Sequence, residues 1–312
     1  MGKRNPPDAM KVTPAENNRR VAAKVKSVQS AWAAYSSVRS KLPPGHWKRL
    51  APIAARQFLQ SGGYLTVVER SAPAAPEPIL QKRFGDADVA LFSKLRGIGY
   101  SPATIYDIGA SDSCWSVTIS PIFAQASFHL FEPLALTLED YRYRMHHTLE
   151  THPQFRLHPI ALASENGTRQ MSVYHNPANS TLLNIPPGDF LQTVLPVECW
   201  RLDDYVRDHQ LPQANVVKID VQGLELEILQ GAVETISRAD ILVLETWLYR
   251  GYGARTPLLN ELVDFLWPLQ FLLTDFGDLY LEERHWLCSI DAFFMSIRFL
   301  DDIKSASRNW DW

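Results

Sequence analysis

The sequence has few cysteines and no long apolar run. Its three cysteines, Cys114, Cys199 and Cys288, are odd in number and far apart. This spacing argues against a disulfide framework and a cysteine-rich zinc site, so we expect each to be a small buried side chain. No stretch approaches the roughly 20 apolar residues of a membrane helix, and the N-terminus has no apolar signal core. We therefore expect a cytoplasmic protein without a membrane span.

Charge is unevenly distributed along the chain. The 312 residues are 46% hydrophobic and 21% charged, which suits one large α/β domain with an appendage. Residues 1–50 contain eleven basic and two acidic side chains, a net charge of +9, whereas the remainder carries −12. The basic segment can bind an anionic partner such as nucleic acid, or it can pack as a helix on an acidic surface of its own chain or a second copy.

Stretches rich in proline and glycine, which end helices or form linkers, predict the domain boundaries. Apolar residues between Val21 and Leu42 recur with helical spacing, and Pro43-Pro44-Gly45 ends that pattern. The stretch Ser71 to Pro78, SAPAAPEP, is typical of an extended linker. We expect a basic helical appendage over residues 1–70, a proline-rich linker over 71–84, an α/β domain over 85–300 and a tail over 301–312.

Beyond the linker, strand and helix patterns alternate, which indicates a doubly wound, mostly parallel sheet wrapped by helices. We expect strands at 104–108, 127–131, 155–162, 169–174, 198–200, 216–219, 241–244, 271–274 and 292–297. We expect helices at 86–96, 134–150, from 203, at 224–237 and at 258–267.

The stretch Thr104 to Ser116, TIYDIGASDSCWS, predicts a strand, a tight turn and a helix. Such a turn lets the backbone and the helix N-terminus approach a ligand closely. A dinucleotide fingerprint needs three glycines, but only Gly109 is present, and Asp107 precedes it. A carboxylate at this place opposes a phosphate and favours a neutral or cationic ligand. The pattern fits a nucleoside site or an ordinary turn.

Acidic residues end four of the predicted parallel strands: Asp107, Glu132, Asp220 and Glu245. Ligands of open parallel sheets bind beyond the carboxyl ends of the strands. One such residue would be an ordinary helix cap, but four on one edge indicate a site. Glu132, 25 positions after Asp107, can accept hydrogen bonds from both ribose hydroxyls of a nucleoside or cap the segment after Pro133.

The segments DIGASD, FHLFEP, ALASENG, WRLDDYV and above all KIDVQGLELEILQGA resemble the FkbM-type methyltransferases, a branch of the class I S-adenosylmethionine-dependent enzymes. The resemblance covers roughly residues 103–294. It implies a Rossmann-like sheet of seven strands, the last antiparallel, and S-adenosylmethionine as the cofactor. It also implies methylation of a hydroxyl on a small molecule or sugar.

The resemblance also assigns roles to individual residues. Those expected to bind the cofactor are Asp107, Gly109, Ala110, Ser111, Glu132, Leu162, Ala163, Ser164 and Asp220. Glu132 would hold the ribose, Leu162 to Ser164 would flank the adenine, and Asp220 would face the methyl donor and acceptor. Ser113 occupies a position where the family commonly has glycine. A serine is tolerated there if its φ is ordinary, and its hydroxyl can then cap the next helix, whereas a positive φ would weaken cofactor binding.

A hydroxyl acceptor needs a general base or a metal ion. Asp220 and Glu245 are candidates for either role, and His175 is a third candidate base. Two carboxylates are too few to predict a metal site, so magnesium is possible but not predicted.

The sequence thus favours a small-molecule or saccharide O-methyltransferase. Two alternatives are an RNA methyltransferase that binds through the basic arm and a pseudoenzyme with a degenerate cofactor site. Nucleic acid is disfavoured because few aromatics lie within the basic stretch. The helix at 21–42 predicts homodimerisation or association with an acidic carrier domain.

Overall fold

The computed structural model describes residues 85–184, 191–281 and 287–306. The chain divides into two units, Met1–Ile79 and Leu80–Trp312. The expected basic helix, the linker at 71–84, and the nucleic-acid and homodimer hypotheses built on the N-terminal segment lie outside the described residues and stay predictions. No helix in the described ranges combines the length and the apolar character needed to cross a membrane.

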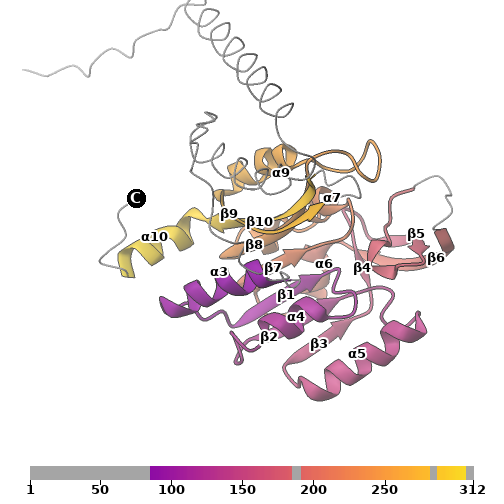
Figure 1. Cartoon of the computed structure of the whole chain (residues 1–312), viewed down its shortest axis with the longest axis horizontal. Helices are drawn as coiled ribbons and strands as arrows, with labels where there is room; N and C mark the ends of the chain where they lie inside the picture. Colours follow the sequence, from indigo (N-terminus) through magenta and orange to yellow (C-terminus); the bar gives the residue numbers. More distant parts are fainter. Residues whose placement is uncertain (1–84, 185–190, 282–286, 307–312) are drawn as a thin grey trace, which may run out of the picture. The chain divides into compact units, whose positions relative to one another are not determined.

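A seven-stranded sheet forms the centre of the second unit (Figure 1). Its strands pair in the order β3-β2-β1-β7-β8-β10-β9. The first five are parallel, and β10 runs antiparallel to both β8 and β9. This arrangement confirms the doubly wound, Rossmann-like fold class, including the antiparallel last strand. The bounds are β1 (Thr104–Ile108), β2 (Ser127–Phe131), β3 (Phe155–His158), β7 (Val216–Ile219), β8 (Ile241–Trp247), β9 (Phe271–Leu281) and β10 (Leu287–Ser296).

Helices cover both faces of this sheet, so β1, β7 and β8 are buried at every position. Successive side chains of a strand point to opposite faces. Tyr106 and Ile108 accordingly pack in one core cluster and Ile105 in the other. The first cluster includes α6 (Leu202–Asp208), α7 (Glu225–Gln230), α8 (Val233–Ile236) and α9 (Leu259–Leu266). The second includes α3 (Asp86–Gly97), α4 (Cys114–Ile119), α5 (Glu139–Thr151) and α10 (Ile297–Ala306).

A small three-stranded sheet adjoins the large one. It has the order β4-β6-β5, with bounds β4 (Ala161–Leu162), β5 (Gly167–Tyr174) and β6 (Leu191–Trp200), and the short helix η2 (Pro177–Asn179) follows β5. Its apolar side chains form a third cluster with Leu134, which follows β2, and Leu224, which follows β7. The small sheet therefore lies beside the carboxyl ends of the parallel strands, where the sequence places its candidate site.

The prediction of one continuous helix over 224–237 is wrong, because the segment is divided into α7 and α8. A Cβ at Gly231 would lie 2.3 Å from the carbonyl oxygen of Ala163, so the chain packs tightly there. The side chain of Asp203, in α6, then accepts hydrogen bonds from the backbone amides of Glu234 and Thr235 at 3.0 and 2.8 Å. A carboxylate from another helix thus starts α8.

Other boundaries also differ from the expectation. Helix α5 begins at Glu139 rather than near Leu134, because residues 133–138 form turns. The described part of the tail expected from residue 301 belongs to helix α10, which buries Phe299, Leu300 and Ile303 in the second cluster. These three apolar residues recur with helical spacing, so they lie on one face of α10, which packs on the core. Helix α9 is continued by the 3-10 turn η3 (Trp267–Leu269). Cys199 is buried as expected, whereas Cys114 is exposed on α4 and Cys288 is half-buried.

Candidate active site

The turn after β1 packs directly against the end of β7. Gly109 has a φ of +79°, and a Cβ on it would lie 1.9 Å from the backbone oxygen of Asp220. The amide of Asp220 donates a hydrogen bond to the carbonyl of Ile108 at 3.0 Å. Only glycine has both the backbone freedom and the space for this position. The turn therefore brings the ends of β1 and β7 together.

Ser113 adopts the left-handed conformation, with a φ of +66°. Of the two alternatives left open by the sequence, the structure has the positive φ, and the side chain makes no capping hydrogen bond to α4. The buried hydroxyl instead donates to the carbonyl of Asp112 and lies 3.1 Å from Oγ1 of Thr148 in α5. Ser113 does not line the pocket described below.

Asp107 is completely buried beneath the turn. One carboxylate oxygen accepts a hydrogen bond from Oγ of Ser116 at 2.7 Å, and the other lies 3.8 Å from Nζ of Lys218. Burial raises the pKa of Asp107, and the Lys218 ammonium opposes that rise. Neither Asp107 nor Ala110 lines the pocket, whereas Gly109 and Ser111 do. Direct contact of Asp107 and Ala110 with the cofactor stays a prediction.

Glu132, at the end of β2, is held by backbone amides. Its Oε2 accepts a hydrogen bond from the amide of Ser111 and its Oε1 one from the amide of Leu134, each at 2.9 Å. Burial raises the pKa of Glu132 to about 7, although the two amides favour the ionised form. A carboxylate has about four acceptor sites, so each oxygen can still accept one hydrogen bond from a hydroxyl group.

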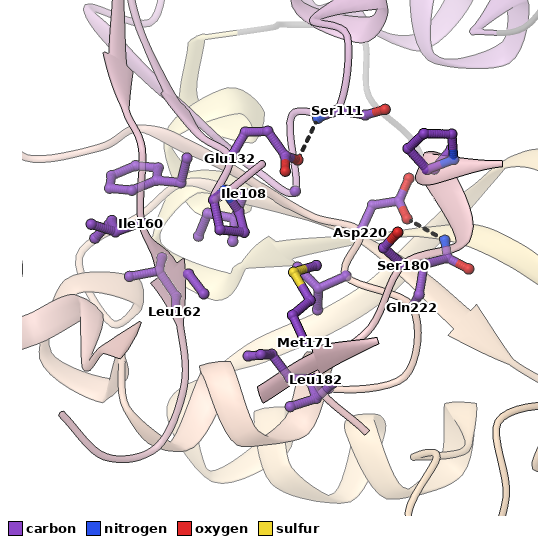
Figure 2. A pocket seen from close by; sticks show the side chains of 18 residues that line it. Ile108, Ser111, Glu132, Ile160, Leu162, Met171, Ser180, Leu182, Asp220 and Gln222 are labelled. Carbon is purple, nitrogen blue, oxygen red and sulfur yellow. Dashed lines mark hydrogen bonds between the residues drawn. The ribbon is translucent and has the colours of Figure 1, made fainter. Parts of the chain in front are cut away.

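One pocket gathers these strand ends (Figure 2). In the close-up, Glu132 and Ser111 lie at one end, and Asp220, Gln222 and Ser180 lie at another. The other labelled side chains are apolar. The pocket is lined by Ile108, Gly109, Ser111, Phe131, Glu132, Pro133, Ile160, Ala161, Leu162, Met171, Pro177, Ala178, Ser180, Leu182, Asp220, Val221, Gln222 and Leu224.

The three residues expected to flank an adenine are placed differently from one another. Leu162, in β4, lines the pocket together with Ile160. Ala163 is buried in the cluster beneath the small sheet, and Ser164 is half-buried; neither lines the pocket. Leu162 therefore shares the pocket with Glu132, while roles for Ala163 and Ser164 stay predictions.

Asp220, at the end of β7, is held by side chains. Its Oδ2 lies 3.1 Å from Nζ of Lys218, and its Oδ1 accepts a hydrogen bond from Nε2 of Gln222 at 2.9 Å. Burial opposes ionisation of Asp220, but the charge of Lys218 and these hydrogen bonds hold its pKa below the ordinary value. Asp220 is thus an anion that lines the pocket.

Glu245, in β8, lies behind this anion and does not line the pocket. Its Oε2 accepts a hydrogen bond from Nε2 of Gln222 at 2.8 Å, and its Oε1 one from Oγ of Ser289 at 3.1 Å. Burial and the negative charge of Asp220 raise the pKa of Glu245 well above its ordinary value. The two candidate carboxyl groups are therefore linked through Gln222, and their pKa values are shifted in opposite directions.

His175 is separated from both carboxylates. It is exposed in the bend that follows β5 and does not line the pocket, although Pro177, Ala178 and Ser180 from the same loop do. The structure thus brings Glu132 and Asp220 to one pocket, places Glu245 next to it and leaves His175 outside. A catalytic role for His175 stays a prediction.

Sequence reasoning missed Lys218, Gln222 and Tyr252. Lys218 precedes Asp220 by two residues, so the period of a strand could have placed both on one face. Gln222 lies in the quoted motif, but nothing in its type marks it as a link between carboxylates. Tyr252 follows β8 in a loop, and its hydroxyl donates to Oε1 of Gln222 at 2.5 Å. No sequence signal predicts that contact.

The residues of the pocket fit the cofactor that the resemblance implies. Glu132 would supply acceptors for the ribose hydroxyls, and Ile160, Phe131 and Leu162 would supply an apolar wall for a flat heterocycle. Asp220 would supply a negative charge for a sulfonium group. In the described parts of the chain, no three or more His, Cys, Asp or Glu side chains are arranged to hold a metal ion.

Comparisons with solved structures gave distant similarities. An FkbM methyltransferase from Methylobacillus flagellatus is 15% identical, with a TM-score of 0.40; the match covers 62% of this chain and 43% of that one. Magnesium protoporphyrin IX methyltransferase from Synechocystis, solved with bound S-adenosylmethionine, is 12% identical, with a TM-score of 0.41 and coverage of 68% and 77%. An O-methyltransferase family protein from Burkholderia thailandensis is 10% identical, with a TM-score of 0.38 and coverage of 69% and 56%.

Sequence comparisons identify the family. A search of curated protein sequences found no match. The family model described as the methyltransferase FkbM domain matches residues 107–279, which is more than half of the chain and runs from β1 into β9. The matched segment includes Glu132, Asp220 and Glu245. The chain therefore belongs to the FkbM family of S-adenosylmethionine-dependent methyltransferases.

Proposed function

We propose that this protein methylates a hydroxyl oxygen of a small molecule or sugar. The observation that carries the proposal is that Glu132 and Asp220, from separate strand ends, line one pocket. Glu132 is the group that would bind the ribose of S-adenosylmethionine, and Asp220 is the anion nearest to where a donor and an acceptor would meet. Met171, Leu182 and Ser180 give the remaining wall a mixed character, which suits an acceptor with hydrocarbon and hydroxyl parts.

When bound, S-adenosylmethionine supplies a methyl group that its sulfonium already activates. The protein then has to align the acceptor and remove its proton. Asp220 lines the pocket and has one hydrogen-bond partner on each oxygen, so each oxygen retains a free acceptor site. In the proposal, Asp220 takes the proton that the hydroxyl loses when its oxygen is methylated. Because its pKa is held low, Asp220 then passes the proton to solvent.

Glu245 and His175 are weaker candidates for the base. Burial and the charge of Asp220 raise the pKa of Glu245, which does not line the pocket, and His175 is exposed outside it. We therefore assign Glu245 a supporting role and Asp220 the catalytic one.

The test is a methyl-transfer assay with isotopically labelled S-adenosylmethionine against a panel of alcohols, sugars, amines and thiols, with mass spectrometry of the products. We expect the label on an oxygen. Asp220→Asn should lower kcat by roughly 100-fold or more, the usual contribution of a general base, while affinity for S-adenosylhomocysteine changes less than about threefold, because that molecule lacks the sulfonium charge. Label found only on nitrogen, sulfur or carbon would overturn the assignment to hydroxyl groups.

A further inference from the structure

Gln222 links parts of the pocket that are far apart in the sequence. Its backbone φ is +59°, in the left-handed region that glycine favours. Its side-chain amide group lies between the carboxylates of Asp220 and Glu245, on β7 and β8. Its backbone oxygen accepts a hydrogen bond from Oγ1 of Thr181 at 2.9 Å, which ties the loop after η2 to the same residue. A side chain with strained backbone and this many partners has a defined orientation.

The orientation of the amide follows from its partners. Nε2 has two hydrogens, and it donates to Oδ1 of Asp220 and to Oε2 of Glu245. Oε1 accepts the hydrogen bond from the hydroxyl of Tyr252. A flipped amide would place its oxygen against the Asp220 anion and its NH2 against the Tyr252 hydroxyl. The Asp220 anion can only accept a hydrogen bond, so it excludes the flipped amide, and the Tyr252 hydroxyl then holds Oε1 of Gln222 in place.

This arrangement controls the charge that faces the pocket. The hydrogen bond from Gln222 to Asp220 favours the ionised carboxylate, and Lys218 adds its charge at the other carboxylate oxygen. Glu245 cannot also ionise without placing a second negative charge against the same amide. The other ionisable groups that act on the pair are Asp107 (β1), Glu225 (α7), Tyr280 (β9), Asp291 (β10) and Tyr252.

We propose that Gln222 is a positioning residue: held by Tyr252, it keeps the Asp220 carboxylate in place as the anion that faces the sulfonium of the methyl donor. The inference rests on the proposed function for the location of the donor and goes beyond it in assigning this work to Gln222 and Tyr252. Neither residue needs to contact the acceptor for this role.

The two forms of the cofactor provide a probe that requires no acceptor. S-adenosylmethionine carries a positive sulfonium, whereas S-adenosylhomocysteine carries a neutral thioether and shares the rest of the molecule. The ratio of their affinities therefore reports the charge and position of Asp220. A purely structural defect in the pocket would weaken both ligands equally.

The experiment measures both dissociation constants by calorimetry for the full chain and three variants. In Gln222→Leu we expect affinity for S-adenosylmethionine to fall by about tenfold and affinity for S-adenosylhomocysteine by less than about threefold, since a lost charge-assisted hydrogen bond acts on the charged ligand. Tyr252→Phe retains Gln222 and should shift the ratio in the same direction by a smaller factor. Gln210→Leu is the matched control, because Gln210 also has a left-handed φ, of +53°, and is exposed away from the pocket.

The possible outcomes separate this inference from the proposed function. Equal losses for both ligands, or no loss, in Gln222→Leu and Tyr252→Phe would overturn the positioning role. Should Gln222→Leu fail to fold, Tyr252→Phe decides alone. Wild-type protein that binds neither ligand would overturn both proposals together. The expected shift in ratio combined with methylation of a non-hydroxyl acceptor would overturn the proposed function alone.

Discussion

The two acidic strand ends that border the pocket are held in different ways. Glu132, after β2, accepts hydrogen bonds from the backbone amides of Ser111 and Leu134. Asp220, after β7, is held by the side chains of Lys218 and Gln222. The position of Glu132 is therefore set by the path of the backbone, and that of Asp220 by residues that single substitutions can remove.

Their charges differ as well. Burial brings the pKa of Glu132 to about 7, whereas the Lys218 ammonium keeps the pKa of Asp220 low despite its burial. Backbone amides carry only partial charges, but Lys218 carries a full one in a buried place, and a full charge shifts a pKa more strongly. The pocket thus combines a carboxyl group that titrates near neutrality with one that stays ionised.

A side chain at Gly109, in the turn that packs against the backbone of Asp220, should have the largest effect on stability. Gly109→Ala places a Cβ against the backbone oxygen of Asp220, at a distance of 1.9 Å in the present geometry. Because backbone rather than a flexible side chain is in the way, we expect a loss of about 3 kcal/mol or more in the free energy of unfolding. Chemical denaturation followed by circular dichroism measures it.

Gly99→Ala is the matched control for that prediction. Gly99 also has a positive φ, of +98°, but a Cβ there would meet nothing within 4 Å. Its substitution should cost only the backbone strain, about 1–2 kcal/mol. Equal losses in the two variants would mean that the tight packing of Gly109 on β7 contributes nothing to stability.

A change of pH should have an intermediate effect, and it should distinguish Glu132 from Asp220 because only Glu132 titrates near neutral pH. The folded-state pKa of Glu132 is raised, so the ligand-free protein holds this proton until about pH 7 and loses stability as pH rises from about 4.5 to 7. Ribose hydroxyls are bound best by the ionised form. We therefore expect affinity for S-adenosylhomocysteine to rise about tenfold from pH 6 to pH 8, since a group of pKa about 7 is roughly one-tenth ionised at pH 6.

Calorimetry at several pH values checks this expectation. Glu132→Gln should bind more weakly and show a flat profile, because the amide does not titrate. Asp220→Asn should retain the wild-type slope, because the low pKa of Asp220 keeps it ionised throughout this range. A slope that survives in Glu132→Gln would assign the titration to another group, such as Glu225, whose pKa burial also raises to about 7.

Relief of the strain at Ser113 should have the smallest effect. Glycine suits the φ of +66° better than serine or alanine, and both substitutions remove the same hydroxyl. We expect Ser113→Gly to be more stable than Ser113→Ala by about 0.5–1 kcal/mol, the left-handed strain less the extra entropy of glycine in the unfolded chain. Thermal denaturation of the two variants measures the difference.

The same pair of variants tests the hypothesis that Ser113 weakens cofactor binding. Ser113 packs against Thr148 and does not line the pocket, so both variants should bind S-adenosylhomocysteine within about twofold of the wild type. A gain of tenfold in Ser113→Gly would show that the strain of the turn reaches the pocket.

Local pattern was sufficient to predict most elements of the fold. The strands at Thr104–Ile108, Ser127–Phe131 and Val216–Ile219 are short apolar runs that end in acidic residues, and their bounds agree with the structure. Their alternation with helices predicted the mostly parallel sheet. Local pattern failed where another element intervenes: Asp203 starts α8 from a distance, and α10, packed on the core, includes residues 301–306 of the expected tail.

The sequence by itself determined the family, the fold class and two of the four predicted acidic strand ends, Glu132 and Asp220, because strand period, turn residues and motif spacing are properties of neighbouring residues. Asp107 and Glu245 instead lie within β1 and β8. Only the tertiary structure decided which acids share a pocket and which charge each carries. Asp107 is buried and accepts a hydrogen bond from Ser116, and Glu245 lies behind Gln222. Glu132 and Asp220 line the pocket. Burial and charged partners set a pKa, and both come from residues distant in the chain. The link from Tyr252 through Gln222 to Asp220 therefore appears only when the chain is folded.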